Sequence, residues 1–185
     1  LLDQLSDLPV NVQILPSYID MMAGNTGGDP FRPVSPDELL GREKVELDTP
    51  EIARAYAGRV IMVTGAGGSI GSELCRQVAR FNPGCLIMYE RDESHLFYID
   101  HEIRKKYPNL KILSIIGDIL NREKFAHLLE IYKPDSIYHA AAYKHVPLME
   151  NEPSEAIRNN LLGTKIISDL AIQYEIPKFI FISTD

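Results

Sequence analysis

The segment TGAGGSIGSE is rich in glycine at a spacing that suits binding of a diphosphate. We expect a strand before it and a helix after it, the context in which such a motif binds a dinucleotide. Gly65 then permits the tight turn, Gly68 lets the backbone approach the diphosphate, and Gly71 lets the helix pack close to the strand. Amide groups near Ser69 and Ile70 would face the anion at the helix N-terminus. The alternative is a glycine-rich turn with a structural role only.

Two carboxylates lie at the ends of the next two expected strands. Glu90 lies 19 residues after Gly71, near the distance at which a dinucleotide fold places an acid on the adenosine ribose. This favours NAD, although Arg91 comes directly after it and a guanidinium there could hold the extra phosphate of NADP. Asp118 could accept a hydrogen bond from the adenine amino group, or it could cap the next helix. A solvated surface pair is the alternative for Glu90 and Arg91.

The segment HAAAYKHVPLMEN follows the fourth expected strand. The small side chains of Ala140, Ala141 and Ala142 would let a nicotinamide ribose approach the backbone, unless they serve tight internal packing. Lys144 could meet a substrate phosphate, and His145 could take part in proton transfer. Both residues could also be ordinary solvated loop side chains.

The segment FIFISTD reads as a buried strand that ends in two hydroxyls and a carboxylate. Ser183, Thr184 and Asp185 would then point into the crevice where the reactive ring of a cofactor lies. A turn or a helix cap is the alternative for these three residues.

An alternation of short apolar runs and helical stretches positions these motifs, and it predicts an α/β fold with a parallel sheet covered on both faces. The expected strands are 59–64, 85–90, 111–117, 135–140 and 178–183. The expected helices are 69–81, 94–106, 121–132 and 154–174. Right-handed crossovers then favour strand order 3-2-1-4-5, a doubly wound Rossmann fold with ligands at the point where the order reverses.

The chain divides by composition into three parts. We expect residues 1–30 to be the tail of a preceding domain, 31–57 a linker with a short helix that starts at Ser35, and 58–185 the dinucleotide-binding half of a catalytic domain. The chain opens without methionine or a basic leader, so we expect an excerpt of a longer protein whose fold is incomplete at the C-terminus.

Charge and cysteine content restrict the function classes. The 185 residues carry 26 acidic and 19 basic side chains, a formal net charge of -7, which argues against nucleic acid or anionic lipid as partners. Cys75 and Cys85 lack metal-ligand spacing, so we expect no metal site and a reduced, cytoplasmic compartment. No run approaches the roughly 18 to 20 apolar residues of a membrane span.

The motifs VTGAGGSIGSEL, AAAYKHVPLME, NNLLGT and ISTD, with DELLGREKV upstream, together resemble the CapD-like polysaccharide-biosynthesis branch of the extended short-chain dehydrogenases/reductases, over residues 31–185. The resemblance implies a nucleotide-sugar 4,6-dehydratase. Such an enzyme uses tightly bound NAD(P) to oxidise C4 of a UDP-N-acetylhexosamine, eliminates water across C5 and C6, and returns the hydride at C6.

The resemblance also assigns roles by position. The implied cofactor residues are Gly65, Gly68, Ser69, Ile70 and Gly71 at the diphosphate, Glu90 or Arg91 at the adenosine ribose, Asp118 with Ile119 at the adenine, Ala140 to Ala142 beside the nicotinamide, and Asn160 in the helix under the active site. Thr184 would hold the C4 hydroxyl, and Asp185 would protonate the departing C6 hydroxyl, which requires a raised pKa.

In this family a lysine follows STD, and a Tyr or Met motif with a second lysine comes later; the sequence ends before them. Long members begin with membrane helices and a first Rossmann-like domain. The segment VNVQILP resembles the last part of that first domain. We therefore expect the fragment to be inactive alone and to self-associate through uncovered apolar faces, and the parent to be a homo-oligomer that meets the membrane only through its N-terminal segments.

Two other functions remain open. A nucleotide-sugar 4-epimerase of the same superfamily would share the cofactor half, but it needs no acid such as Asp185 at C6. A non-enzymatic Rossmann domain that senses NAD(P) would bind the cofactor without turnover. The combination of AAAYKHVPLME with STD argues against a sensor, which has no use for reactive groups beside the nicotinamide.

Overall fold

The computed structural model describes residues 13–14, 32–33 and 50–183. The chain separates into two compact units, 1–47 and 48–185. In the first unit the described residues form a short antiparallel pair, β1 (Gln13–Ile14) and β2 (Arg32–Pro33). The helix expected at Ser35 lies outside the described residues.

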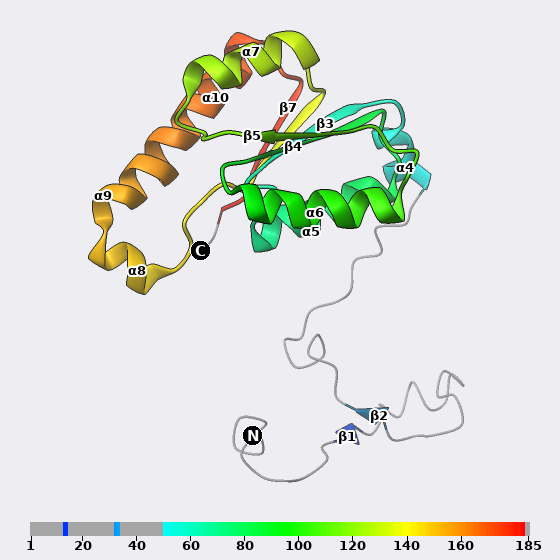
Figure 1. The fold of residues 1–185 in the computed structure, drawn as a ribbon, viewed down its shortest axis with the longest axis horizontal. Coiled ribbons are helices and arrows are strands. Elements are labelled where there is room, and N and C mark those ends of the chain that lie inside the picture. The colour runs from blue at the N-terminus through cyan, green and yellow to red at the C-terminus, as the bar shows by residue number, and fades with distance from the viewer. Residues whose placement is uncertain (1–12, 15–31, 34–49, 184–185) are drawn as a thin grey trace. The chain divides into compact units, whose positions relative to one another are not determined.

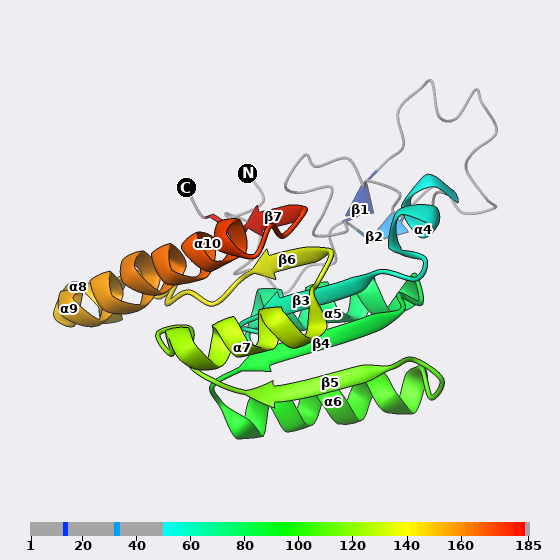
Figure 2. The ribbon, with the colours of Figure 1, turned by 90° about the horizontal axis from the view of Figure 1, so that it is seen from above.

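A five-stranded parallel sheet forms the centre of the second unit (Figures 1 and 2). Its strands are β3 (Val60–Thr64), β4 (Cys85–Glu90), β5 (Ile112–Ile116), β6 (Ser136–His139) and β7 (Lys178–Phe181). They are ordered β5-β4-β3-β6-β7, and every neighbouring pair is parallel. This confirms the predicted order 3-2-1-4-5, whose direction reverses beside β3.

Helices cover both faces of the sheet (Figure 1). Helices α5 (Ser69–Arg80) and α6 (Glu93–Lys106) pack on one face, where Ile61 and Val63 of β3 point. Helices α7 (Arg122–Tyr132) and α10 (Thr164–Gln173) pack on the other face, against Met62 of the same strand. Alternate strand residues therefore enter two separate apolar cores, which explains why the strands are apolar throughout.

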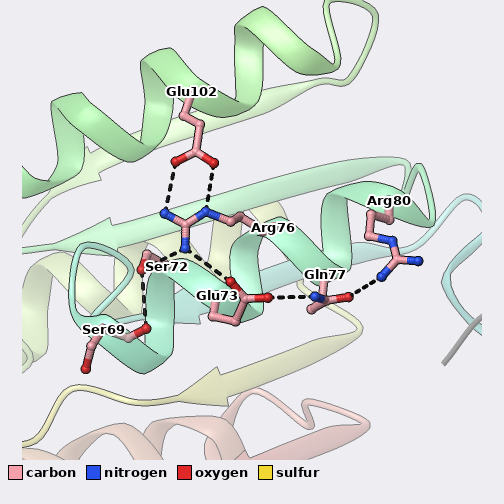
Figure 3. Close-up of polar contacts among 7 residues, drawn as sticks. All are labelled: Ser69, Ser72, Glu73, Arg76, Gln77, Arg80 and Glu102. Atoms are coloured by element: carbon pink, nitrogen blue, oxygen red, sulfur yellow. Dashed lines mark hydrogen bonds and ion pairs between the residues drawn. The ribbon is translucent and has the colours of Figure 1, made fainter. Parts of the chain in front are cut away.

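An ion pair joins the two helices on the first face (Figure 3). The Arg76 guanidinium of α5 donates to both carboxylate oxygens of Glu102 on α6, over 2.7 and 2.9 Å. Hydrogen bonding to Arg76 lowers the pKa of Glu102, and the same contact raises the pKa of Arg76. The pair thus fixes α5, whose N-terminus follows the glycine-rich loop.

The helices of this unit differ from the prediction at its start and in the region of the predicted helix 154–174. A helix at the start of the unit, α4 (Pro50–Tyr56), was not predicted, and its Tyr56 ring stacks on Phe81 with centroids 5.3 Å apart. The predicted uninterrupted helix is divided into α9 (Pro153–Ala156), a π-helical segment η1 (Ile157–Gly163) and α10, and a short α8 (Val146–Asn151) precedes it.

A close approach accompanies the π-helical segment. A Cβ on Gly163 would lie 2.4 Å from the terminal methyl of Ile119, so a larger residue there would require the Ile119 side chain to move. None of the helices in the described residues is long and apolar enough to span a membrane.

Candidate functional site

The glycine-rich segment that connects β3 to α5 leaves no room for a side chain at Gly65 in the loop or at Gly71 in the first turn of α5. Gly65 has a positive φ of 67°, and a Cβ there would lie 2.7 Å from the Ala140 oxygen and the Ala141 Cα. A Cβ on Gly71 would lie 1.9 Å from the Gly65 oxygen. The loop therefore packs directly on the start of α5 and on the segment after β6.

The N-terminus of α5 offers hydrogen-bond donors at this loop. Gly68 is its N-cap, and no side chain of the described residues caps the first turn. The first amides of a helix lack partners inside the helix and carry a partial positive charge, so they suit an anion. Lys144 adds a cation, because its Nζ donates to Oγ of Ser69 over 2.6 Å.

The Glu90 carboxylate at the end of β4 is fixed by three backbone amides. Oε2 accepts a hydrogen bond from Gly67 over 3.0 Å, and Oε1 accepts from Arg91 and Asp92 over 2.9 and 3.0 Å. Asp92 in turn caps α6, because its side chain accepts from the amide of His95. The carboxylate thus has a defined position beside the glycine-rich loop.

Asp118 and Ile119 follow β5. Oδ1 of Asp118 accepts from the Leu120 amide over 2.8 Å, and its carbonyl accepts from the Tyr89 hydroxyl over 2.8 Å. Burial raises the pKa of Tyr89, so this hydroxyl stays protonated. The cap of α7 is Asn121 and not Asp118, since the Asn121 side chain accepts from Lys124.

His139 ends β6 and is buried between two hydroxyls. Nδ1 lies 2.7 Å from Oγ1 of Thr64, and Nε2 lies 2.9 Å from Oγ1 of Thr164. The ring also stacks against Phe179 and against Phe181. Burial lowers the pKa of His139 to about 4, so the imidazole is neutral at physiological pH and joins β3, β6 and α10.

Two asparagines of the π-helical segment hold the loop after His139. Nδ2 of Asn160 donates to the Tyr143 carbonyl, and its Oδ1 accepts from the Tyr143 amide, each over 2.9 Å. Nδ2 of Asn159 donates to the Ala141 carbonyl over 3.2 Å and to Oδ1 of Asn160 over 2.9 Å. These bonds fix the backbone that carries Tyr143 and Lys144.

A cleft of about 610 Å³ opens at the carboxyl ends of these strands. The predicted site residues that line it are Gly65, Gly68, Ser69, Ile70, Glu90, Arg91, Asp118, Ile119, Ala140, Ala141, Ala142, Lys144 and Asn160. His145 and Ser183 also line it, whereas Gly71 is buried beneath the loop. The catalytic candidates Thr184 and Asp185 lie outside the described residues.

Sequence reasoning missed several residues of this cleft. Tyr143 and Asn159 stand inside the quoted motifs, next to predicted residues, and that adjacency was the available signal. Tyr89 lies within a strand that was predicted only as core. His95 of α6 is exposed and also lines the cleft.

These features suit a dinucleotide. The uncapped start of α5 can donate to phosphate oxygens, the three alanines leave room for a flat ring, and the volume lies within the usual range of ligand sites. Within residues 50–183, side chains of the type that bind metal ions do not gather in groups of three or more. Cys75 and Cys85 are buried free thiols, and burial raises the pKa of both.

Comparison with known sequences finds relatives in sugar metabolism. The chain is 44% identical to the capsular polysaccharide biosynthesis protein CapD of Staphylococcus aureus, over 92% of this chain and 29% of that protein. It is 30% identical to a UDP-N-acetylglucosamine 4,6-dehydratase (inverting) of Campylobacter jejuni, over 70% of this chain and 37% of that enzyme. It is 31% identical to a UDP-glucose 4-epimerase of Rickettsia massiliae, over 70% of this chain and 38% of that enzyme.

Solved structures share the fold. Pen from Bacillus thuringiensis is 30% identical with a TM-score of 0.63, over 68% of this chain and 37% of that one. A second structure is a UDP-glucose 4-epimerase from Stenotrophomonas maltophila, solved with bound NAD and formylated UDP-arabinopyranose. It has a TM-score of 0.60 at 21% identity and covers 68% of this chain and 37% of its own. This confirms the predicted Rossmann-type α/β fold.

A family model described as polysaccharide biosynthesis protein matches residues 61–185, which include the whole cleft. The chain spans 29% and 30% of the lengths of CapD and of its Bacillus subtilis counterpart EpsC. Because the matched segment covers more than half of the chain, this chain belongs to the polysaccharide biosynthesis protein family.

Proposed function

We propose that the protein containing this chain is a nucleotide-sugar 4,6-dehydratase that acts on a UDP-N-acetylhexosamine in polysaccharide biosynthesis. The observation that carries the proposal is the cleft at the reversal of strand order, which combines an uncapped helix N-terminus, a fixed acid and a wall of alanines. The similarity to CapD and to the Campylobacter dehydratase supports the choice of reaction.

In this proposal the described residues bind and orient a dinucleotide, which would accept a hydride from the sugar and give it back. The first amides of α5 hold the diphosphate, and Lys144, which donates to Ser69 beside them, meets a phosphate of the substrate. Glu90 receives the adenosine ribose, Asp118 and Ile119 flank the adenine, and the alanines after β6 lie along the nicotinamide. Asn160 keeps the β6 loop in place.

We assign the reactive steps to the next residues of the chain. Ser183 lines the cleft, and Thr184 and Asp185 follow it directly in sequence. Thr184 would hold the C4 hydroxyl, while the Asp185 carboxyl would give its proton to the C6 hydroxyl. A base removes the proton from C5, the electrons of that C5–H bond form a double bond between C5 and C6, and the C6–O bond breaks so that water leaves. A carboxyl in this role needs a pKa near the working pH, which a partly desolvated site can supply.

The second candidate is a nucleotide-sugar 4-epimerase, which the similarity to the Rickettsia enzyme favours. An epimerase uses the same cofactor half and returns the hydride to C4, so it needs no proton donor at C6.

We place either reaction in the cytoplasm, which the free thiols of Cys75 and Cys85 support.

Product analysis separates the two candidates. The full-length protein is incubated with UDP-N-acetylglucosamine, and the nucleotide sugars are separated and identified by mass spectrometry and NMR. A dehydratase gives a 4-keto-6-deoxy sugar, 18 mass units lighter than the substrate because one water is lost. Accumulation of the 4-epimer without loss of water would contradict the dehydratase and support the epimerase.

An Asp185→Asn variant tests the assigned proton donor. We expect it to lower the rate of water loss by about 100-fold or more, the usual contribution of a general acid, while the bound dinucleotide remains. Equal activity of Asp185→Asn and the wild type would remove Asp185 from this role.

A further inference from the structure

Arg91 and Tyr143 meet across the mouth of the cleft although 52 residues separate them. Arg91 follows β4 and Tyr143 lies on the loop after β6, and β3 stands between these strands in the sheet. Nη2 of Arg91 donates to the Tyr143 hydroxyl, and the guanidinium carbon lies 4.8 Å from the centre of the Tyr143 ring. The guanidinium therefore has both a hydrogen bond to Tyr143 and a cation–π contact with its ring.

The position of Tyr143 is fixed from the opposite side. Asn160 holds both the amide and the carbonyl of Tyr143, and Asn159 orients the Asn160 side chain. The ring is partly buried, whereas Arg91 is an exposed side chain. An exposed cation thus contacts an aromatic residue whose backbone is held in place, so Tyr143 positions the guanidinium.

Glu90 differs from the exposed Arg91, because the position of its carboxylate is fixed. Three backbone amides hold both carboxylate oxygens at the edge of the cleft. In dinucleotide folds an acid at this position binds the ribose hydroxyls, and a neighbouring arginine accommodates the 2'-phosphate of NADP. A fixed carboxylate repels that phosphate unless a cation compensates for it.

We propose that Tyr143 determines cofactor specificity by engaging Arg91, which leaves Glu90 to select NAD over NADP. This inference rests on the proposed function only in that the cleft must bind a dinucleotide. Tyr143 is a positioning residue, since it acts on the cofactor through Arg91. Removal of its hydroxyl frees the guanidinium to approach a 2'-phosphate next to Glu90.

The test measures binding and not turnover. Nucleotide-free full-length protein is titrated with NADH and NADPH, whose fluorescence changes on binding, and the ratio of the two Kd values is compared among variants. We expect the wild type to bind NADH more tightly. Tyr143→Phe lowers the Kd for NADPH about tenfold, which corresponds to one hydrogen bond to a charged group, and changes the Kd for NADH less than about twofold.

A mutant cycle isolates Arg91. Arg91→Ala alone leaves the ratio of Kd values within about threefold of the wild type, and in the Tyr143→Phe background it removes the gain in NADPH affinity. Tyr143→Leu, which also removes the cation–π contact, shifts the ratio at least as far as Tyr143→Phe. Tyr98→Phe serves as the matched control, because Tyr98 is 69% exposed on α6 and lies outside the cleft.

Three results overturn the inference. They are an unchanged ratio in Tyr143→Phe, a tenfold loss of NADPH affinity in Arg91→Ala alone, and a wild type that prefers NADPH. In all three the protein still binds a dinucleotide, so the proposed function survives. A wild type that binds neither NADH nor NADPH overturns the inference and the proposed function together.

Discussion

Individual glycines of the loop after β3 have separable roles. A Cβ at Gly71 meets a backbone oxygen at 1.9 Å, whereas a Cβ at Gly68 meets one at 3.3 Å. The first contact requires the backbone to move, and the second requires a shift of a few tenths of an ångström. The start of α5 is therefore more sensitive to packing at Gly71 than at Gly68.

We predict that Gly71→Ala lowers the free energy of unfolding by about 3 kcal/mol, the upper range for overpacking. Gly68→Ala costs less than about 1 kcal/mol but weakens dinucleotide binding about tenfold, because the added methyl stands where the diphosphate must approach. Urea unfolding and fluorescence titration check the two parts. If Gly68→Ala binds the dinucleotide like the wild type, the diphosphate does not lie at this loop.

The buried imidazole of His139 makes stability depend on pH. Its pKa is lowered to about 4 in the fold and is about 6.5 in an unfolded chain, so the unfolded state takes up the proton first as pH falls. Above pH 6.5 both states are neutral and this dependence is absent. Between pH 6.5 and 4 the free energy of unfolding falls by about 3 kcal/mol.

Urea unfolding at pH 7, 6, 5 and 4.5 measures this dependence, and His139→Gln is the comparison. The variant is less stable at pH 7 because its hydrogen bonds to Thr64 and Thr164 change, but its free energy should be nearly flat over this range. An equal fall in the variant would show that groups other than His139 cause the pH dependence.

Sequence motifs predicted most residues that line the cleft, because a local pattern specifies a turn or a helix start. Local patterns could not predict the contacts between motifs that are distant in sequence. Arg91 and Tyr143 are distant in sequence and join only when β4 and β6 flank β3, and His139 stood unnoticed at the head of a quoted motif.

At the scale of elements, strands were predicted well and the last helix was not. Apolar runs bounded by turns define buried strands. The periodicity between residues 154 and 174 indicated one helix, but the structure contains a π-helical segment there. The segment carries the two asparagines that hold the β6 loop and Gly163 against Ile119, and such interruptions often accompany functional sites.

The contact between α5 and α6 gives a prediction at this scale. We expect a coupling free energy of about 0.5 to 1 kcal/mol between Arg76 and Glu102 in a double-mutant cycle, small because both side chains are about half exposed to water. The pKa of Glu102 is lowered, so this contribution is present above about pH 4.5 and is lost at lower pH.

Arg76→Ala, Glu102→Gln and the double variant are compared by urea unfolding at pH 7 in low and high salt. The coupling should shrink at 1 M salt, where surface charges are screened. Glu130→Gln on α7 is the control for loss of one exposed carboxylate. A coupling that does not change with salt would show that the two side chains interact by packing and not by charge.

At the scale of the molecule, strand order followed from general rules of topology, since right-handed crossovers leave few arrangements for alternating strands and helices. Helix α4 escaped prediction because its surroundings have linker composition, although Tyr56 packs against the core. Fold class and cleft position were thus predictable, whereas the borders of short peripheral elements were not.

The expected homo-oligomer stays a prediction, and two elements, η1 and α8, carry exposed apolar side chains that suit it. Ile157 and Leu161 of η1 are more than half exposed, as are Val146 and Leu148 of α8. We expect Leu161→Glu to shift the sedimentation of the full-length protein toward monomers, whereas Ile131→Glu on α7 does not. The same distribution in wild type and Leu161→Glu would exclude this surface.

The most direct test of the proposed reaction follows the hydrogen at C4. UDP-N-acetylglucosamine that carries deuterium at C4 is converted by the full-length protein, and NMR with mass spectrometry locates the label. A 4,6-dehydratase transfers the deuterium to C6 of a 4-keto-6-deoxy product. Deuterium that stays at C4 of an epimerised sugar, or a substrate that is never converted, would contradict the dehydratase.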